Sequence, residues 1–178
     1  MDISNKERAK QIILEIVRQA GGKLDNKTNL FKAFYHSHLK FAESSPGFLS
    51  EWPIVRMPNG PGIDKFDVLV GELMAEGHLR TTQVQKGNVA AFRFTLTDKP
   101  VPDMGADEVM AIRYGVMQVH GKTAAEVSKK SHRRAWQETS NGSPMNIYVD
   151  LIPDEDYERQ DRVRKAVDGA FDVAIFRR

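Results

Sequence analysis

Residues 64–97 read DKFDVLVGELMAEGHLRTTQVQKGNVAAFRFTLT, and this stretch decides the fold. Its first part carries apolar residues at helical spacing, which predicts a helix that ends at Gly77. These residues are Phe66, Leu69, Val70, Leu73 and Met74, preceded by Ile63. Two runs of strand-forming residues follow at 78–84 and 89–97. Because the polar, glycine-containing connector 85–88 joins them, the pattern predicts a β-hairpin directly after the helix.

Two further helices are expected before this stretch. Apolar spacing predicts the first from Ser4, where Ser4 and Glu7 form a capping box, to a stop at Gly21-Gly22. A broad apolar face predicts the second over 28–42. Prolines and glycines between 48 and 62 exclude a long regular helix, so we expect an ordered loop there.

The second half of the chain is expected to be mainly helical after a proline-containing linker at 98–103. We predict a helix over 106–120, a short helix from Thr123 toward Lys130, an edge strand over 146–152 and a last helix over 154–171. Thr123 and Glu126 are spaced as the capping box of the short helix.

These elements predict a mainly α fold with a small β-hairpin (α+β). A compact helical domain is expected at 1–140, with its hairpin at about 78–97. The helix and hairpin look like a winged-helix unit. A C-terminal extension at 141–178 is expected to hold a short strand and a helix.

Composition narrows the functional classes. The chain has 178 residues, of which 40% are hydrophobic and 28% charged, and this mixture suits one folded domain. It has no cysteine, which excludes disulfides, thiolate metal sites and a cysteine nucleophile. The start, MDISNKERAK, lacks the pattern of a secretion signal, and no apolar run is long enough for a membrane span. We therefore expect a soluble, cytoplasmic protein without membrane association.

No motif in the sequence predicts catalysis or a bound cofactor. The histidines His36 and His38 are two residues apart and face different sides of a helix, which disfavours a metal site. The glycine-rich segment 59–62 lacks the Lys-Ser/Thr ending of a phosphate-binding loop. The carboxylates at 150 and 154–156 lack the spacing of a calcium loop. We expect no catalytic residue, no cofactor and no metal.

Three segments carry a resemblance to a known family. They are Lys32-Ala33-Phe34-Tyr35, then Gly60-Pro61, then Ala125-Glu126-Val127-Ser128 with Ser131-His132 and Ala135-Trp136. In this order they resemble the Panacea domain, the SocA-like antitoxin family, between about residues 24 and 139. Val127 stands where that signature usually has Leu, and Arg133-Arg134 follow the histidine where an acidic residue is common.

The resemblance implies an antitoxin of bacteria or phages that binds a cognate toxin encoded nearby. Neutralisation would be by direct contact or by delivery of the toxin for proteolysis. The family-motif residues that become candidates for partner binding are Lys32, Phe34, Tyr35, Gly60, Pro61, Ser131, His132 and Trp136. Lys129, Lys130, Arg133 and Arg134 are candidates for a basic contact, against the alternative of a solvated charged face.

Trp136 and His132 are four residues apart and would share a face if the short helix continued. We expect Trp136 to be largely buried against the second helix, near Phe34 and Tyr35.

Other functions stay open. A winged-helix DNA-binding regulator would place helix 64–76 in the major groove and Lys86 on a phosphate. That helix, however, carries Asp64, Asp67, Glu72 and Glu76 against the single Lys65, and phosphates would be repelled. An enzyme using His, Asp, Glu, Ser or Tyr and a purely structural role are further alternatives. The sequence leaves the partner's identity and the oligomeric state open.

Overall fold

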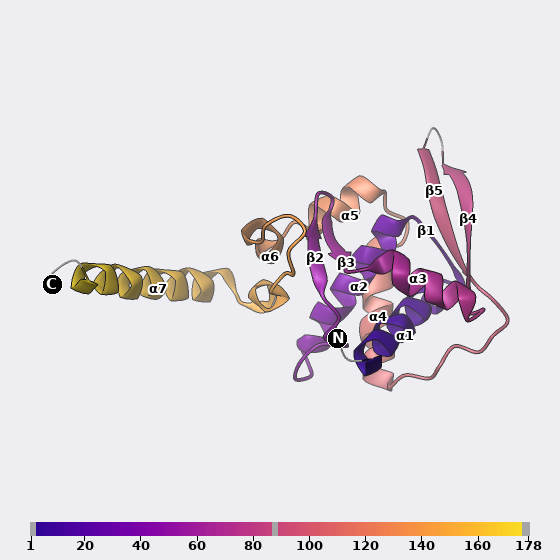
Figure 1. The fold of residues 1–178 in the computed structure, drawn as a ribbon, viewed down its shortest axis with the longest axis horizontal. Coiled ribbons are helices and arrows are strands. Elements are labelled where there is room, and N and C mark those ends of the chain that lie inside the picture. Colours follow the sequence, from indigo (N-terminus) through magenta and orange to yellow (C-terminus); the bar gives the residue numbers. More distant parts are fainter. Residues whose placement is uncertain (1–2, 87–88, 176–178) are drawn as a thin grey trace.

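Three helices form the centre of the molecule in a computed structural model that describes residues 3–86 and 89–175 (Figure 1). They are α1 (Ile3–Gln19), α2 (Lys27–Ala42) and α4 (Ala106–Val119). Helix α2 packs mainly against α4, α1 contacts both of them, and the α2 face with Leu30 and Phe34 is fully buried. Helix α4 approaches α2 closely at Gly115, where a Cβ atom would lie 2.4 Å from the carbonyl oxygen of Ala33. Only glycine fits at this crossing.

The first helix begins one residue earlier than expected. Because α1 starts at Ile3, Ser4 already lies inside the helix rather than at its cap. The predicted stop is confirmed, since Gly21 and Gly22 have φ values of 83° and 81°. The Gly22 N–H donates to the carbonyl of Val17, which ends the helix.

The predicted helix and hairpin are confirmed. They are α3 (Phe66–Ala75), β4 (Leu79–Lys86) and β5 (Val89–Leu96). Sequence analysis missed β1 (Lys23–Asp25), which pairs with β5 and gives the sheet order β1-β5-β4. Met74 was predicted to be buried on α3 but is 42% exposed. The tip residues 87–88 and the side chain of Lys86 lie outside what the structure describes.

The segment between α2 and α3 was expected to be an ordered loop, but it also contains strands. It contains a two-stranded sheet of β2 (Ile54–Met57) and β3 (Gly60–Ile63). Pro61 is tolerated in β3 because its partner Arg56 directs its backbone hydrogen bonds to the other side. The Arg56 N–H donates to the carbonyl of Ser143 at 2.9 Å, and the Gly142 N–H donates to the carbonyl of Arg56 at 2.8 Å.

The second half contains α5 (Ala124–Ser131), α6 (Arg134–Glu138), the 3-10 helix η1 (Ile147–Leu151) and α7 (Asp154–Ile175). The capping box at Thr123 is confirmed. The edge strand over 146–152 was a wrong prediction. The Asn146 side chain accepts from the Tyr148 N–H and starts η1, while Met145 makes the strand-like bond, from its N–H to the carbonyl of Ile54. Helix α7 projects away from the rest of the molecule (Figure 1).

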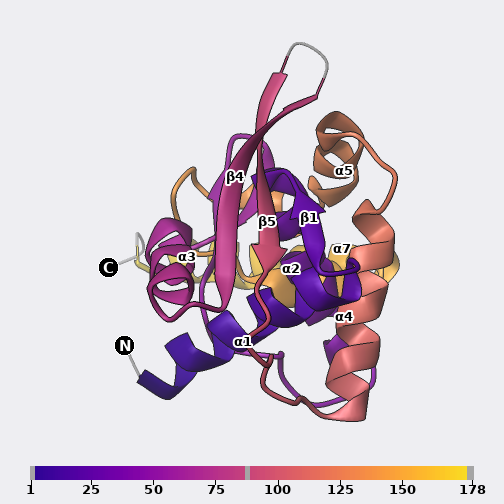
Figure 2. The same ribbon diagram turned by 90° about the vertical axis from the view of Figure 1, so that its right-hand side faces the viewer.

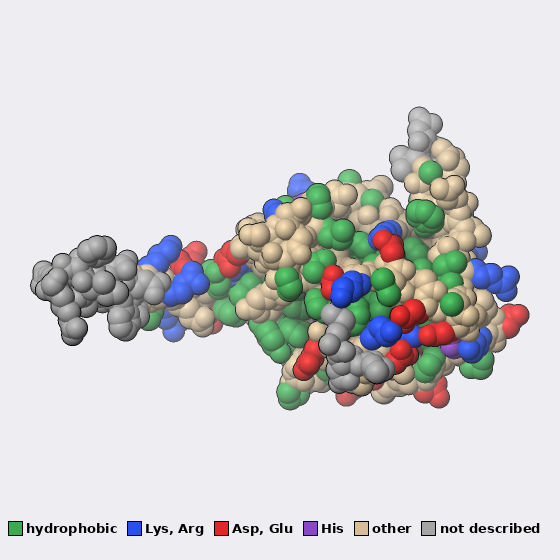
Figure 3. Space-filling model, in the orientation of Figure 1, with side chains coloured by type: hydrophobic (Ala, Val, Ile, Leu, Met, Phe, Trp, Pro, Cys, Tyr) green, Lys and Arg blue, Asp and Glu red, His purple; other side chains and the backbone are tan. Residues whose placement is uncertain are grey.

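The fold is therefore mainly α with a small antiparallel sheet, as predicted. In Figure 2 the hairpin β4–β5 rises beside β1, and α4 runs along the outside of the helical body. Figure 3 shows acidic and basic side chains interleaved on the face that carries α1 and α3. Among the helices that the structure describes, none has both the length and the apolar character needed to cross a membrane.

Candidate partner-binding site

The three segments that carry the family resemblance meet in space. They come together where α2, β3 and the end of α5 converge around Gly60. A Cβ atom at Gly60 would lie 2.5 Å from Ser131 Oγ, 2.9 Å from Lys32 Nζ and 3.1 Å from His132 Cδ2. Gly60 also has a φ of 96°, which favours glycine. This position therefore requires glycine for both its space and its backbone conformation.

Lys32 is the buried titratable residue of this cluster. Its side chain is 1% exposed, and Nζ donates to the carbonyl oxygen of Pro61 at 2.7 Å. Burial lowers the pKa of Lys32 to about 7, because the charged form loses its hydration. A large share of the Lys32 side chains is therefore uncharged near neutral pH.

Ser131 fixes the end of α5 in the same cluster. It is fully buried, and its Oγ donates to the carbonyl of Ser128 at 2.8 Å. A serine and a lysine of lowered pKa are the residue types of some nucleophilic sites. In this structure both side chains are closed to solvent, so they join elements rather than face a substrate.

Trp136 differs from its predicted placement. Helix α5 ends at Ser131 and α6 starts at Arg134, so no continuous helix carries His132 and Trp136. Trp136 is only partly buried, and its indole N–H donates to the Met57 carbonyl at 2.8 Å. Its hydrogen-bonding partner is thus β2 rather than α2.

Trp136 is also held by its two ring contacts. The His132 ring stacks on it at 3.8 Å and 5°, and the Arg56 guanidinium lies 4.4 Å from its ring centroid. These two contacts fix the position of the indole beside β2 and α5. Burial, with the nearby Lys32, lowers the pKa of His132. Its Nε2 has no hydrogen-bond partner among the residues that the structure describes.

Tyr35 and Phe34 lie in the core. The Tyr35 hydroxyl donates to the Asp150 carboxylate at 2.5 Å, and that carboxylate also accepts from the Ala135 N–H at 2.9 Å. Burial, and then the negative charge of Asp150, raise the pKa of Tyr35 above its usual range. Phe34 is fully buried and packs against His38. Of the family-motif residues, His132 and Trp136 are those that reach the surface.

The predicted basic contact divides into two parts. Lys129, Lys130 and Arg133 are exposed. Arg134 instead anchors α7, since it forms an ion pair with Asp154 and its guanidinium lies 3.8 Å from the Tyr157 ring centroid.

An exposed apolar stripe on α4 was missed by sequence analysis. Met110, Tyr114 and Met117 are 61%, 39% and 64% exposed, and their spacing places them on one face of the helix. The opposite face, with Ile112 and Val116, is buried. The signal in the sequence was a helix with apolar residues on two sides, which one buried face does not explain.

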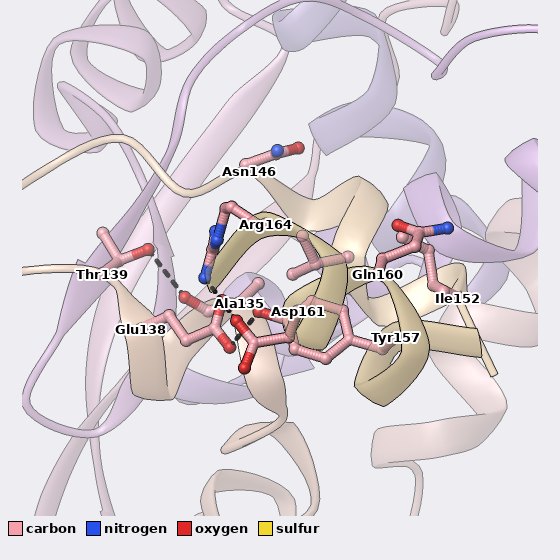
Figure 4. Close-up of a pocket in the computed structure, with 10 residues that line it drawn as sticks. Ala135, Glu138, Thr139, Asn146, Ile152, Tyr157, Gln160, Asp161 and Arg164 are labelled. Carbon is pink, nitrogen blue, oxygen red and sulfur yellow. Dashed lines mark hydrogen bonds and ion pairs between the residues drawn. The ribbon is translucent and has the colours of Figure 1, made fainter. Parts of the chain in front are cut away.

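A cavity of about 580 Å³ lies where α6, η1 and α7 meet (Figure 4). Its main polar groups bond to one another. The Tyr157 hydroxyl donates to Glu138 at 2.5 Å, and Arg164 donates to Asp161 at 2.6 Å. This pairing does not point to a particular ligand.

Comparison with known proteins gives no relative: no protein-family model, curated protein or solved structure matches the chain.

Proposed function

We propose that the chain is a protein-binding module that contacts its partner through the Met110–Tyr114–Met117 stripe of α4. This exposed stripe is the observation that carries the proposal. Apolar side chains aligned on an exposed helix face gain free energy when a partner covers them. Methionine adapts its shape readily and is frequent on binding surfaces.

The stripe stands on a rigid support. Its helix is fixed to α2 by the close approach at Gly115 and by the buried Ile112 and Val116. Arg113 adds a hydrogen bond to Gln19 on α1 at 3.2 Å. A preformed surface loses little conformational entropy when it binds.

The partner class that the family resemblance suggests is a cognate toxin. Support comes from the meeting of the three resembling segments around Gly60, because a shared signature is expected to form one structural unit. In this proposal the buried cluster keeps the surface in shape, and the toxin is neutralised by contact or delivered for proteolysis.

DNA binding by α3 is less well supported. The exposed Asp67 of α3 is paired with Lys27, and Glu72 is paired with Lys6. Val68 and Met74 are exposed and apolar. Such a face repels phosphates, and the exposed Lys65 at the start of the helix does not balance these acids. A mobility shift at low salt with the DNA upstream of its gene would favour this alternative.

The test is co-expression with the product of the adjacent reading frame. We expect wild-type protein to restore growth and to co-purify with that product. The Met110→Glu/Met117→Glu variant should bind at least about tenfold more weakly, the effect of removing hot-spot contacts. Val68→Glu/Met74→Glu, which changes two apolar side chains on α3 that are 53% and 42% exposed, is the control and should bind normally. A harmless neighbour that does not bind would contradict the toxin assignment.

A further inference from the structure

Four basic side chains at and near α5 lack a carboxylate partner among the described residues. They are Lys122, Lys129, Lys130 and Arg133. Lys122 Nζ donates to the carbonyl of Gln118 at 2.6 Å, and Arg133 donates to the carbonyl of Asp150 at 2.7 Å. These acceptors are uncharged. Glu126, an acidic residue of α5, accepts hydrogen bonds from the N–H and the hydroxyl of Thr123.

The positive charges of these side chains act on the same groups and repel one another. The pKa of Lys122 is lowered by burial and then by the positive charge of Lys130, against a weaker attraction to Glu126. His36 on α2 faces Arg133, Lys130 and Lys122, and burial followed by these charges lowers its pKa to about 4. Like charges held together without a counterion destabilise the free protein, and a bound anion would relieve the repulsion.

This basic cluster continues the apolar stripe. Helix α4 ends at Val119, two residues after Met117, and the Lys122 ammonium group folds back onto this end, where it donates to the carbonyl of Gln118. Binding surfaces commonly combine an apolar centre with a charged rim. Lys122, Lys130 and Arg133 would form that rim at one end of α4.

We propose that the partner presents a carboxylate-rich segment to Lys122, Lys130 and Arg133, beside the apolar stripe of α4. This inference rests on the proposed function and names the chemistry of the partner. Opposite charges at the rim accelerate association and select against basic partners.

An acidic protein segment fits this site better than a nucleic acid. Single-stranded nucleic acids bind by stacking successive bases on exposed aromatic rings, whereas the stripe offers one such ring, Tyr114, between two methionines. Duplex DNA needs cations along several phosphates, whereas these are confined to α5 and its two ends. The stripe of apolar side chains next to them suits a protein surface.

The direct test is a titration of ¹⁵N-labelled protein with a decaglutamate peptide at low salt. We expect the amide signals of Lys122, Thr123, Lys130 and Arg133 to shift, and the shifts to shrink at about 0.3 M salt because of screening. Lys122→Glu/Lys130→Glu should weaken binding at least tenfold, and the neutral Lys130→Gln should weaken it less. Lys65→Glu/Arg80→Glu reverses two other exposed cations and should leave it unchanged.

Several results would overturn this inference. They are an absence of shifts, shifts centred away from α5, equal weakening in the control variant, and stronger binding of a short DNA duplex than of the peptide at the same amides. Failure of this inference can be distinguished from failure of the proposed function. If the adjacent product binds normally to Lys122→Glu/Lys130→Glu but not to the Met110→Glu/Met117→Glu variant, the protein-binding function stands and the acidic-segment inference fails.

Discussion

Replacing Lys32 by Met should change how stability depends on pH. The pKa of about 7 in the folded chain lies below the ordinary lysine value of 10.5, so between these values the unfolded chain binds more protons than the folded one. The free energy of unfolding of the wild type must therefore rise with pH through this window. The full difference corresponds to about 5 kcal/mol, to order of magnitude. Methionine has a similar length and no charge, so the variant should lose this rise.

The variant also leaves the Pro61 carbonyl without its donor, which costs about 1–3 kcal/mol at every pH. At pH 6 the variant should therefore be the more stable protein by about 2–4 kcal/mol, and the two should converge near pH 9. Urea unfolding followed by tryptophan fluorescence between pH 6 and 9 measures this. Parallel stability curves for the two proteins would refute the reasoning, because they would mean that Lys32 is not a buried, discharged amine.

Three further predictions concern the stability of the same domain. Gly60→Ala should lower the unfolding free energy by about 2–4 kcal/mol through steric clash and backbone strain, measured by thermal melting. Gly21→Ala is the control, because its φ is 83° and no atom lies near, so only about 1 kcal/mol of strain is expected. Tyr35→Phe should cost about 1–3 kcal/mol by leaving a buried carboxylate short of a donor; an unchanged melting temperature would contradict this. The free energy of unfolding should fall as the pH drops from about 6.5 toward 4. His36 and His38 have pKa values of about 4 in the folded chain, so the unfolded chain takes up protons at a higher pH than the folded one. His38→Gln should weaken this acid dependence, and an identical acid profile for that variant would be evidence against it.

Periodicity predicted α1, α2 and α3 well because each has one strongly buried face. The spacing of Leu30, Phe34 and their neighbours gave α2 within one residue at its start. The short sheets were harder to predict. Strand β1 has only three residues, too few for a pattern. Strand β3 contains Pro61 between two glycines, a composition typical of loops. Its partner β2 also bonds to distant residues at 142–145, which the local sequence does not reveal.

The candidate site shows the same division. The resemblance identified Lys32, Gly60 and Ser131, and the structure brings them together. It did not reveal that these residues are buried, because burial depends on how α2, β3 and α5 pack. The predicted packing of Trp136 against α2 was wrong because the helix is interrupted after Ser131, and Trp136 therefore turns toward β2. The outer stripe of α4 was missed because a helical pattern does not show which apolar face lacks a neighbour.

The bond between Tyr35 and Asp150 joins residues that are 115 positions apart. A ribosome that adds about 5–20 residues per second needs roughly 6–23 seconds to synthesise that interval. By the end of this time α2 has left the exit tunnel, but until then Asp150, whose carboxylate accepts the hydrogen bond of the buried Tyr35 hydroxyl, has not been synthesised. The nascent chain must therefore keep an incomplete core in water for seconds.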